Sequence, residues 1–570
     1  MACPQRRGVD EEIRRVDDGA RGCRAGRDLR SRRDDVLDRG APRAGSRRSA
    51  AGRPATRSAH VSTVLVALPR RLHPRRPPPR APGEAARVAD RAGARVARRA
   101  CAARRAGSRR ERARAMSPIA SVERELRASV AAEVVAPTAA YLSDETEARG
   151  IRGHADAVAL PRTAEEVAEV VAWCYAHDVA IVPRGGGTGY AAGAVPLDGG
   201  VVLALERLDR VRSFDPLLWR IHVEAGLRTG ELRRLGREGG LLFPPDPGAA
   251  EQSQIGGNIA TNAGGPHAYK YGVTGAWVTG LEVVIAPGEV VQLGGPLTKD
   301  VAGYDLKHLL IGSEGTLGVI TAAWLRLTPA PEAAWPVVGF FEGLRAGCAA
   351  IERVVGSGLP AAALEYLDGE TMRYTGATFP GDVPAGAFAV IAEADGSRDE
   401  AARVRTDLLD VFGEDALSVY APETPAEIAA LWRWRDGLTL VVGAQRGGKA
   451  GEDIAVPLDR LAEAIQESLE IGRRLGLPAC SWGHAGDGNL HTTFLVASDD
   501  ERELALVERA SEELFDLALR LGGTISGEHG VGFVKHNWLE RQLGPRAFDL
   551  HGAVKHVFDP RNLLNPGKKA

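Results

Sequence analysis

Two segments near the C-terminal end of the chain carry residue types that ligate metal ions. His484 and His491 flank an Asp-Gly pair at 487–488. Asp-Gly favours a type I′ turn, because both central positions of that turn need a positive φ, which Asp and Gly tolerate. Such a two-residue turn places His484 directly opposite His491 on antiparallel strands, with Cβ atoms about 4.5 to 5.5 Å apart. The two imidazoles could therefore converge on one cation.

Glu528 lies about forty residues further on and could supply a third, anionic ligand. Two imidazoles and one carboxylate leave coordination positions open, which is typical of a catalytic metal site rather than of a closed structural one. The alternative interpretation is that the Gly-Asp-Gly segment is only a turn and that the histidines are ordinary buried or surface side chains. The metal interpretation requires the two segments to meet in the fold.

Three glycine-rich loops precede these segments, at residues 184–193, 254–265 and 312–318. Glycine lets the backbone approach a phosphate closely, and consecutive N–H groups form an anion-binding nest. The first loop matches a dinucleotide fingerprint, but Pro196 and a further glycine pair follow it instead of a helix, which argues against a Rossmann site. Each loop could be only a tight turn. Together they favour a long ligand with a pyrophosphate and two ring systems.

The N-terminal part of the chain has a composition of its own. Residues 1–115 contain 32 Arg, no Lys and 12 acidic residues, whereas the 570-residue chain as a whole has a net charge of -1. This part lacks a sustained apolar period, so it cannot bury enough surface to offset chain entropy, and we expect disorder. Arg without Lys is typical of GC-rich DNA read from an upstream start. We therefore expect the extension to be mis-assigned and Met116 to be the true beginning.

Composition also excludes several classes of protein. A nucleic-acid-binding tail or a transit peptide is the alternative for the Arg-rich part, but that part lacks interleaved aromatic residues and contains Asp-Asp pairs. No run approaches the roughly 18 apolar residues that a membrane span needs. The six cysteines are scattered without a CxxC pair, which argues against a disulfide framework, a zinc ribbon and an iron–sulfur cluster. We expect a cytoplasmic protein, with peripheral attachment to the inner membrane as the alternative.

Apolar patterns divide the remaining chain into two domains of α+β character. In the first, which runs to about residue 329, we predict helices from 163 and over 229–238, and strands at 157–161, 180–183, 201–205, 220–224, 280–285 and 318–327. In the second, the order βαββαβ is typical of a ferredoxin-like unit, with strands at 336–341, 361–367, 388–394 and 417–420 and helices at 346–355 and 400–412. Two amphipathic helices, at 457–475 and 501–521, frame the histidine hairpin.

Five motifs in this chain resemble those of one known family. They are Pro183–Gly189, Ile255–Gly265, Gly312–Thr321, Gly483–His491 and Gly527–Gly532. Together they resemble the FAD-linked oxidases of the vanillyl-alcohol oxidase type, and most closely D-lactate dehydrogenase (cytochrome), D-2-hydroxyglutarate dehydrogenase and the flavoprotein subunit of glycolate oxidase. The resemblance spans roughly residues 137–568 and covers nothing before Met116.

The resemblance implies a domain organisation. A PCMH-type FAD-binding domain would cover 151–330, and a ferredoxin-like cap domain with the metal hairpin would cover 331–530. An N-terminal helical segment would occupy 116–150, and a helical C-terminal segment, 531–570, would return to the FAD-binding domain.

The resemblance also implies noncovalent FAD, because the first glycine loop has Thr188 and Tyr190 where covalent members have a histidine. The implied FAD contacts are Gly185, Gly186, Gly187, Thr188, Gly189, Gly193, Gly256, Gly257, Asn258, Glu314, Gly318, Ile320 and Asn565.

The implied reaction is oxidation of a D-2-hydroxy acid, similar to lactate, glycolate or 2-hydroxyglutarate, to the 2-oxo acid by hydride transfer to flavin N5. Metal-using members imply that His484, His491 and Glu528 hold a divalent metal, zinc or manganese, that orients the substrate. His529 would remove the hydroxyl proton, and Arg435 would pair with the substrate carboxylate. The expected partners are the small acid, an electron acceptor (a cytochrome, a quinone or an electron-transfer flavoprotein) and a second copy in a homodimer, with no nucleic acid.

Alternatives remain for the site and for the function. His529 could be structural, and Arg433 and Arg446 compete with Arg435 for the carboxylate. Lys449 could contact a second acidic group, although its surroundings depart from the pattern of 2-hydroxyglutarate enzymes. The rival functions are a metal-independent flavin oxidase of another alcohol, a flavoprotein subunit active only in a complex, and a flavin-free metallohydrolase.

Overall fold

The structure is a computed structural model that describes residues 120–497 and 500–569. The predictions for the Arg-rich extension and for Met116 lie outside these residues.

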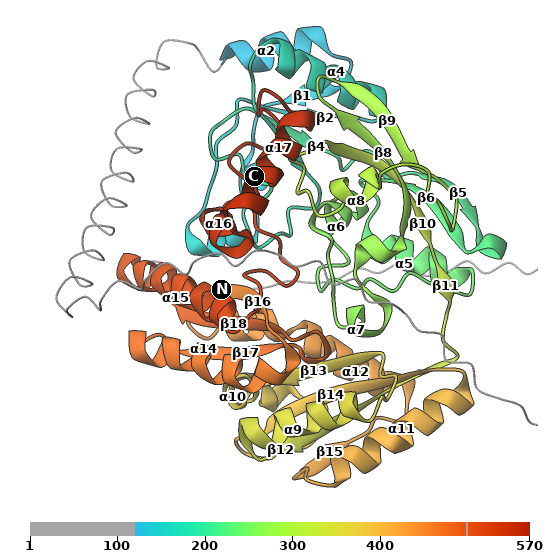
Figure 1. The fold of residues 1–570 in the computed structure, drawn as a ribbon, viewed down its shortest axis with the longest axis vertical. Helices are drawn as coiled ribbons and strands as arrows, with labels where there is room; N and C mark the ends of the chain where they lie inside the picture. The colour runs from blue at the N-terminus through green and yellow to red at the C-terminus, as the bar shows by residue number, and fades with distance from the viewer. Residues whose placement is uncertain (1–119, 498–499, 570) are drawn as a thin grey trace, which may run out of the picture. The chain divides into compact units, whose positions relative to one another are not determined.

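The first part of the described chain contains two main sheets (Figure 1). One has the order β1-β2-β4-β3, with the bounds Glu133–Val135, Ala157–Leu160, Val201–Ala204 and Ile181–Arg184. The other is antiparallel and has the order β5-β6-β10-β8-β9, with the bounds Val211–Asp215, Arg220–Glu224, Val319–Arg326, Val278–Ile285 and Glu289–Gly294. A short pair joins β7, Leu241–Leu242, to β11, Thr328–Pro329.

The helices of this part pack against the two sheets. They are α2 Ala120–Ser129, α3 Ala139–Leu142, α4 Ala164–Ala176, α5 Thr229–Glu238, α6 Ile255–Thr261, α7 Ala268–Tyr271 and α8 Leu306–Leu310. The hydroxyl of Thr163 accepts the N–H of Glu166 at 3.2 Å, so α4 begins at the predicted N-cap. The second glycine loop, predicted as irregular chain, contains α6.

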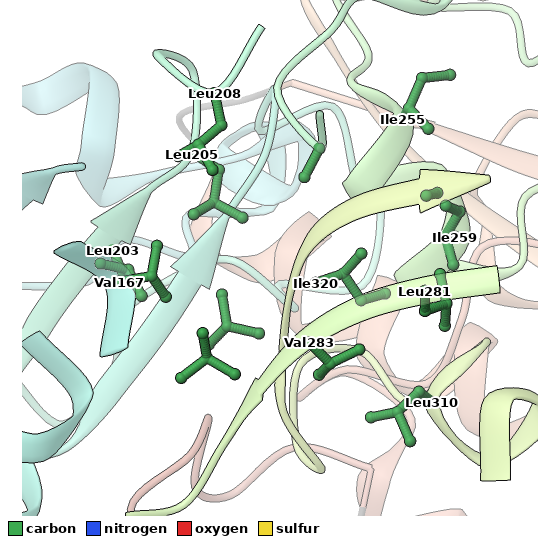
Figure 2. Packing of buried hydrophobic residues seen from close by; sticks show 14 of the residues in the cluster. Val167, Leu203, Leu205, Leu208, Ile255, Ile259, Leu281, Val283, Leu310 and Ile320 are labelled. Atoms are coloured by element: carbon green, nitrogen blue, oxygen red, sulfur yellow. The ribbon is translucent and has the colours of Figure 1, made fainter. Parts of the chain in front are cut away.

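One buried hydrophobic core joins the sheets and fixes the glycine loops that leave them. Figure 2 shows Leu203 of β4, Leu281 of β8 and Ile320 of β10 in this core, together with Ile255 and Ile259 of α6. All five side chains are at most 5% exposed. Helix α6, which lies within the second glycine loop, is therefore anchored by its apolar residues, while Gly257 faces open space.

The second part is built on a seven-stranded antiparallel sheet of the order β15-β12-β14-β13-β17-β18-β16. Its strands are β12 Ala333–Phe341, β13 Ala363–Leu367, β14 Phe388–Gly396, β15 Ser418–Tyr420, β16 Gly448–Ala455, β17 Ala479–His484 and β18 Asn489–Val496. The first four strands have the predicted ferredoxin-like arrangement. The other three extend the sheet beyond that unit, and β16 was not predicted.

Helices cover the two faces of this sheet unequally (Figure 1). One face packs against α9 Gly343–Gly356, α11 Arg398–Gly413, α14 Leu461–Leu475 and α15 Glu501–Arg520. Part of the other face packs against α10 Gly369–Thr375, α12 Pro425–Asp436 and α13 Leu438–Gly443. The rest of that second face carries polar side chains that meet the first part of the chain.

The C-terminal segment contains α16 Leu539–Leu543 and α17 Pro545–Phe558, and then returns to the first part. Leu564 forms a parallel bridge with Ile181 of β3, and the N–H of Asn565 donates to the carbonyl oxygen of Ile181 at 2.7 Å. Among the described residues, no helix combines the length and apolar character that crossing a bilayer requires.

Candidate active site

The hairpin that carries His484 and His491 has a different register from the predicted one. Trp482, rather than His484, lies opposite His491. The chain reverses in a 3₁₀ turn over 485–487, and Gly488 follows at φ +66°, so the turn lacks the pair of positive φ angles that type I′ needs. The predicted two-residue turn is therefore wrong. Because the shift is two residues, both histidines still project from one face of the sheet.

Glu528 joins these two histidines in a compact cluster. Its Oε1 lies 3.2 Å from Nε2 of His484 and 3.3 Å from Nε2 of His491, and the two Nε2 atoms lie 3.5 Å apart. These are imidazole and carboxylate groups that can ligate a divalent cation while leaving positions open. The structure thus brings together the three residues predicted as metal ligands, and their metal binding stays a prediction.

Glu365 of β13 lies behind His484 and orients it. Its Oε1 lies 2.6 Å from Nδ1 of His484, and its Oε2 accepts hydrogen bonds from Nε of Arg435, at 2.9 Å, and from Nη2 of the same side chain. Burial alone would raise the pKa of Glu365, but His484 and Arg435 lower it to about 2. Burial disfavours the charged form of His484, yet Glu365 and Glu528 hold its pKa well above the usual value.

Arg435, predicted to pair with a substrate carboxylate, already has a protein partner. Its Nε and Nη2 are bound to Glu365, so a bidentate grip on a substrate by these two atoms is not available. The side chain still lines the same cavity as the metal cluster. The pairing of Arg435 with a substrate carboxylate stays a prediction.

Asp453 of β16 holds the loop that carries Glu528 and His529. Its carboxylate accepts the backbone N–H groups of Gly527 at 2.8 Å and of Glu528 and His529 at 3.0 Å each. The ammonium group of Lys535 lies 3.6 Å away. Burial opposes ionisation, but the positive field of Lys535 holds the pKa of Asp453 well below its usual value. The negative charge therefore fixes the loop geometry.

His529 lies between two other rings. It stacks on His491 with ring centroids 5.0 Å apart, and on Tyr190 of the first glycine loop with centroids 4.7 Å apart. Burial lowers the pKa of His529 to about 4, although Asp453 acts in the opposite direction. A neutral imidazole in this position can accept a proton. His529, His491 and Asp453 also lie close enough to share a cation, but the Asp453 carboxylate is occupied by the loop.

The first two glycine loops lie against each other and leave open space in front. A Cβ at Gly186 would lie 2.3 Å from the carbonyl oxygen of Gln252, and one at Gly185 would lie 3.4 Å from Cα of Gly257. A Cβ at Gly257 would meet no protein atom within 4 Å. Oε1 of Gln254 is buried and receives no hydrogen bond within the described part of the chain. The two loops thus pack tightly against each other and leave open space at Gly257 and an unused acceptor at Gln254. These features fit a large ligand with phosphate and ring groups.

Two of the predicted FAD contacts also hold protein loops together. Nδ2 of Asn565 donates to the carbonyl oxygens of Gly193 at 2.9 Å and Glu314 at 2.7 Å. The carboxylate of Glu314 accepts the N–H groups of Val531 at 2.9 Å and Gly532 at 2.6 Å. The C-terminal segment is thus fastened to the third glycine loop. Direct contact of either side chain with FAD stays a prediction.

One cavity of about 940 Å³ joins the glycine loops to the histidine cluster. It is lined by all predicted metal and catalytic residues, which are His484, His491, Glu528, His529 and Arg435. It is also lined by every predicted FAD contact except Asn565, namely Gly185, Gly186, Gly187, Thr188, Gly189, Gly193, Gly256, Gly257, Asn258, Glu314, Gly318 and Ile320. The segments that the metal interpretation required to meet do meet.

Sequence reasoning missed the carboxylates that support this cluster. Glu365 interrupts the apolar run Ala-Ala-Ala-Leu-Glu-Tyr-Leu, and Asp453 lies in Glu-Asp-Ile-Ala-Val. An acidic residue inside a strand with apolar neighbours is a signal, because a buried charge needs a partner. Its partner could not be identified without the strand order.

Comparisons with known proteins define the class. A model described as "FAD binding domain" matches residues 155–294, and one described as "FAD linked oxidases, C-terminal domain" matches residues 330–569. The fold is similar to p-cresol methylhydroxylase with substrate bound, with a TM-score of 0.60, 19% identity and coverage of 73% of this chain and 89% of that one. It is also similar to 4-ethylphenol oxidase from Gulosibacter chungangensis, with a TM-score of 0.64, 18% identity and coverage of 79% and 97%. The protein is thus a flavoprotein with a PCMH-type FAD-binding fold.

Sequence relatives narrow the class to one family. "Glycolate oxidase subunit GlcD" of Bacillus subtilis is 38% identical over 72% of this chain and 88% of the relative. "D-lactate dehydrogenase" of Anaerostipes hadrus is 34% identical over 71% and 87%, and "D-2-hydroxyglutarate dehydrogenase" of Xanthomonas citri pv. viticola is 35% identical over 72% and 88%. The chain belongs to the FAD-linked oxidases. It is an FAD-linked oxidoreductase, and the flavin-free alternative is excluded.

Proposed function

We propose that this protein oxidises a small D-2-hydroxy acid to the 2-oxo acid, using FAD and a divalent metal. The observation that carries the proposal is the convergence of His484, His491, Glu528 and His529 on the cavity that the glycine loops line. Three relatives are named for glycolate, D-lactate and D-2-hydroxyglutarate, and these names support this class of substrate.

The metal would bind to Nε2 of both histidines and to the Glu528 carboxylate. Glu365 supports this assignment, because a carboxylate that accepts the Nδ1–H of His484 leaves its Nε2 lone pair for a cation. Bound there, zinc or manganese would act as a Lewis acid toward the hydroxyl and carboxylate oxygens of the acid. The alternative is that protonated His484 simply forms ion pairs with Glu365 and Glu528.

The first two glycine loops and the C-terminal segment would hold the cofactor in place. FAD, bound without a covalent link, supplies the hydride acceptor. The backbone of the first two glycine loops would bind its phosphates, and Gly257 leaves the space that a bound group needs. The C-terminal segment would close the site through its bonds to Glu314.

Proton removal is assigned to His529. With a pKa of about 4, this imidazole is neutral at physiological pH and can accept the hydroxyl proton. Stacking on His491 and Tyr190 fixes the plane of the ring. Arg435 would contribute its positive charge and one amino group to the substrate carboxylate, while Glu365 holds the rest of the guanidinium.

The electrons must then pass to an acceptor, for which we propose a cytochrome, a quinone or an electron-transfer flavoprotein. We also propose a homodimer as the assembly and the cytoplasm as the compartment. The word "subunit" in the name of one relative supports the alternative of a flavoprotein that works within a larger complex.

The test is anaerobic reduction of the bound flavin. The FAD-loaded protein is mixed with D- and L-forms of lactate and 2-hydroxyglutarate and with glycolate, before and after treatment with a chelator, and flavin absorbance is followed. Bleaching by a D-acid or by glycolate, loss of bleaching after chelation, and recovery with zinc or manganese are expected. Unchanged bleaching in metal-free protein would refute the metal role, and no bleaching by any of these acids would refute the substrate class.

A further inference from the structure

One buried carboxylate joins the first part of the described chain, which contains the FAD-binding domain and is called the flavin-binding part below, to a helix of the second part. Oε1 of Glu393 on β14 lies 2.8 Å from Nε2 of His267, and Oε2 accepts the indole N–H of Trp432 at 2.9 Å. The rings of His267 and Trp432 also approach each other, with centroids 5.5 Å apart. His267 precedes α7 in the flavin-binding part, whereas Trp432 belongs to α12. Glu393 therefore connects these two elements directly.

The same helix carries Arg435, one turn after Trp432. Residues three apart on a helix share a face, so both side chains project from the same face of α12. Glu365 holds Arg435 and Glu393 holds Trp432. The two carboxylates come from the neighbouring strands β13 and β14 and point to one face of the sheet, because Glu393 pairs with Ala363. Helix α12 is thus held at two points, and His267 reaches one of them.

His267 carries a positive charge between two anions. Its Nδ1 lies 2.5 Å from Oδ2 of Asp246, which also belongs to the flavin-binding part. Burial works against the charge, but Asp246 and Glu393 hold the pKa of His267 well above its usual value. The imidazolium therefore neutralises one carboxylate from each part. Without it, Asp246 and Glu393 would face each other uncompensated.

A second set of bonds beside it keeps the two parts together. Lys270 forms an ion pair with Asp395, and the hydroxyl of Tyr271 donates to the same carboxylate. Loss of His267 alone should therefore loosen the hold on α12 without separating the two parts of the chain.

We propose that His267 is a positioning residue for Arg435, acting through Glu393 and Trp432 to fix helix α12 relative to the flavin site. The proposal rests on the proposed function, in which Arg435 faces the substrate carboxylate. His267 lines the same cavity as Arg435, but in this role it acts on the guanidinium through Glu393 and Trp432 and not by contact with substrate or cofactor. It sets where the guanidinium lies, so its loss should weaken substrate binding more than turnover.

The first experiment needs no substrate. Hydrogen exchange of the FAD-loaded full chain is compared between wild type and His267→Gln, with His308→Gln as control, because His308 forms an exposed pair with Asp305 away from the cavity. Exchange in peptides of 425–436 is expected to rise at least about threefold in His267→Gln, with 461–475 unchanged. Equal exchange in all three proteins would overturn the proposal. Asp246→Asn keeps the histidine and should give a smaller rise, so the test stands if His267→Gln fails to fold.

The second experiment asks whether the effect passes through Arg435. KM and kcat are measured with an artificial acceptor for wild type, His267→Gln, Arg435→Lys and the double variant, using the acid that wild type oxidises fastest. His267→Gln is expected to raise KM about five- to tenfold with kcat nearly unchanged, and to raise it much less in the Arg435→Lys background. Additive effects would show a general structural role and overturn the proposal. If wild type oxidises none of the acids, the proposed function fails, while the exchange experiment still tests the hold on α12.

Discussion

Glu365, which is buried in strand β13, accepts the Nδ1–H of His484 at 2.6 Å. Because Glu365 accepts the Nδ1–H, the neutral form of His484 would be the tautomer whose Nε2 lone pair faces Glu528. Glu365 also connects the predicted metal site to Arg435 through the second oxygen of the same carboxylate. Two side chains of the proposed site thus depend on one acid that is not itself a proposed ligand.

Replacement of this acid should weaken metal binding. In Glu365→Gln the amide can still contact His484, but the negative charge is lost, so we expect a 10- to 100-fold lower metal affinity, on the order seen for such supporting carboxylates. Competition with a chromogenic chelator measures it. Glu370→Gln, which removes an exposed acid paired with Arg373, is the control and should leave the affinity unchanged. Equal affinities in both variants would contradict the assignment of Glu365.

Gly257→Ala should separate folding from cofactor binding. The position is helical and open, so a methyl group meets no protein atom, and Ala favours the helix by about 0.5 to 1 kcal/mol over Gly. We expect unchanged or higher stability of the FAD-free protein but at least about tenfold weaker FAD binding, because the methyl group enters the cavity. Fluorescence quenching of FAD gives the dissociation constant. Gly356→Ala is the control, because Gly356 lies in α9 and a methyl group there also meets no protein atom. If Gly257→Ala binds FAD as tightly as Gly356→Ala does, the assigned cofactor position is refuted.

Tyr190 should matter through its ring rather than its hydroxyl. The ring stacks on His529, so Tyr190→Phe is expected to keep kcat within about twofold of wild type. Tyr190→Ala removes the ring that stacks on the His529 imidazole, so it should lower kcat by about 10- to 100-fold with little change in KM. Stopped-flow reduction of the flavin measures the step directly. A Phe variant as slow as the Ala variant would instead assign the function to the hydroxyl group.

Asp453 should contribute stability that depends on pH. Its folded-state pKa is depressed, so its contribution is present above the unfolded-state pKa of about 3.9 and is lost as pH falls toward the folded-state value. At pH 7 we expect Asp453→Asn to destabilise the protein by about 3 to 5 kcal/mol, because Lys535 keeps a buried charge without its anion. Urea unfolding at several pH values gives the free energy of unfolding of both proteins. The difference between wild type and variant in this free energy should shrink below pH ~4. Asp516→Asn, an exposed acid paired with Arg541, is the control.

Local sequence patterns predicted the elements of both parts well, because apolar periodicity records which face of each element is buried. The ferredoxin-like order from β12 to β15 is one example. The His484 turn was predicted wrongly, since a two-residue and a longer turn give the same alternation of side chains. Helix α6 was not predicted, because its glycines lower the helix propensity of the segment. Tertiary packing of Ile255 and Ile259 overrides this low propensity.

Long-range partners account for the rest of what was missed. Strand β16 has Gly, Lys and Glu where a strand pattern needs apolar residues, and its pairing with β18 decides its conformation. The bond between Arg435 and Glu365 joins residues 70 positions apart, so no local pattern contains it. The candidate ligands could be predicted because their residue types and spacing are chemically restrictive. The carboxylates that orient them are ordinary residues of strands.

The fastening of Asn565 to Ile181, Gly193 and Glu314 has a consequence for biosynthesis. The first glycine loop is translated almost four hundred residues before the segment that closes over it. While the ribosome still holds that last segment, the loops of the flavin site lack part of their own support. We therefore expect a nascent chain stalled in α17 to bind FAD less tightly than the chain that contains Asn565.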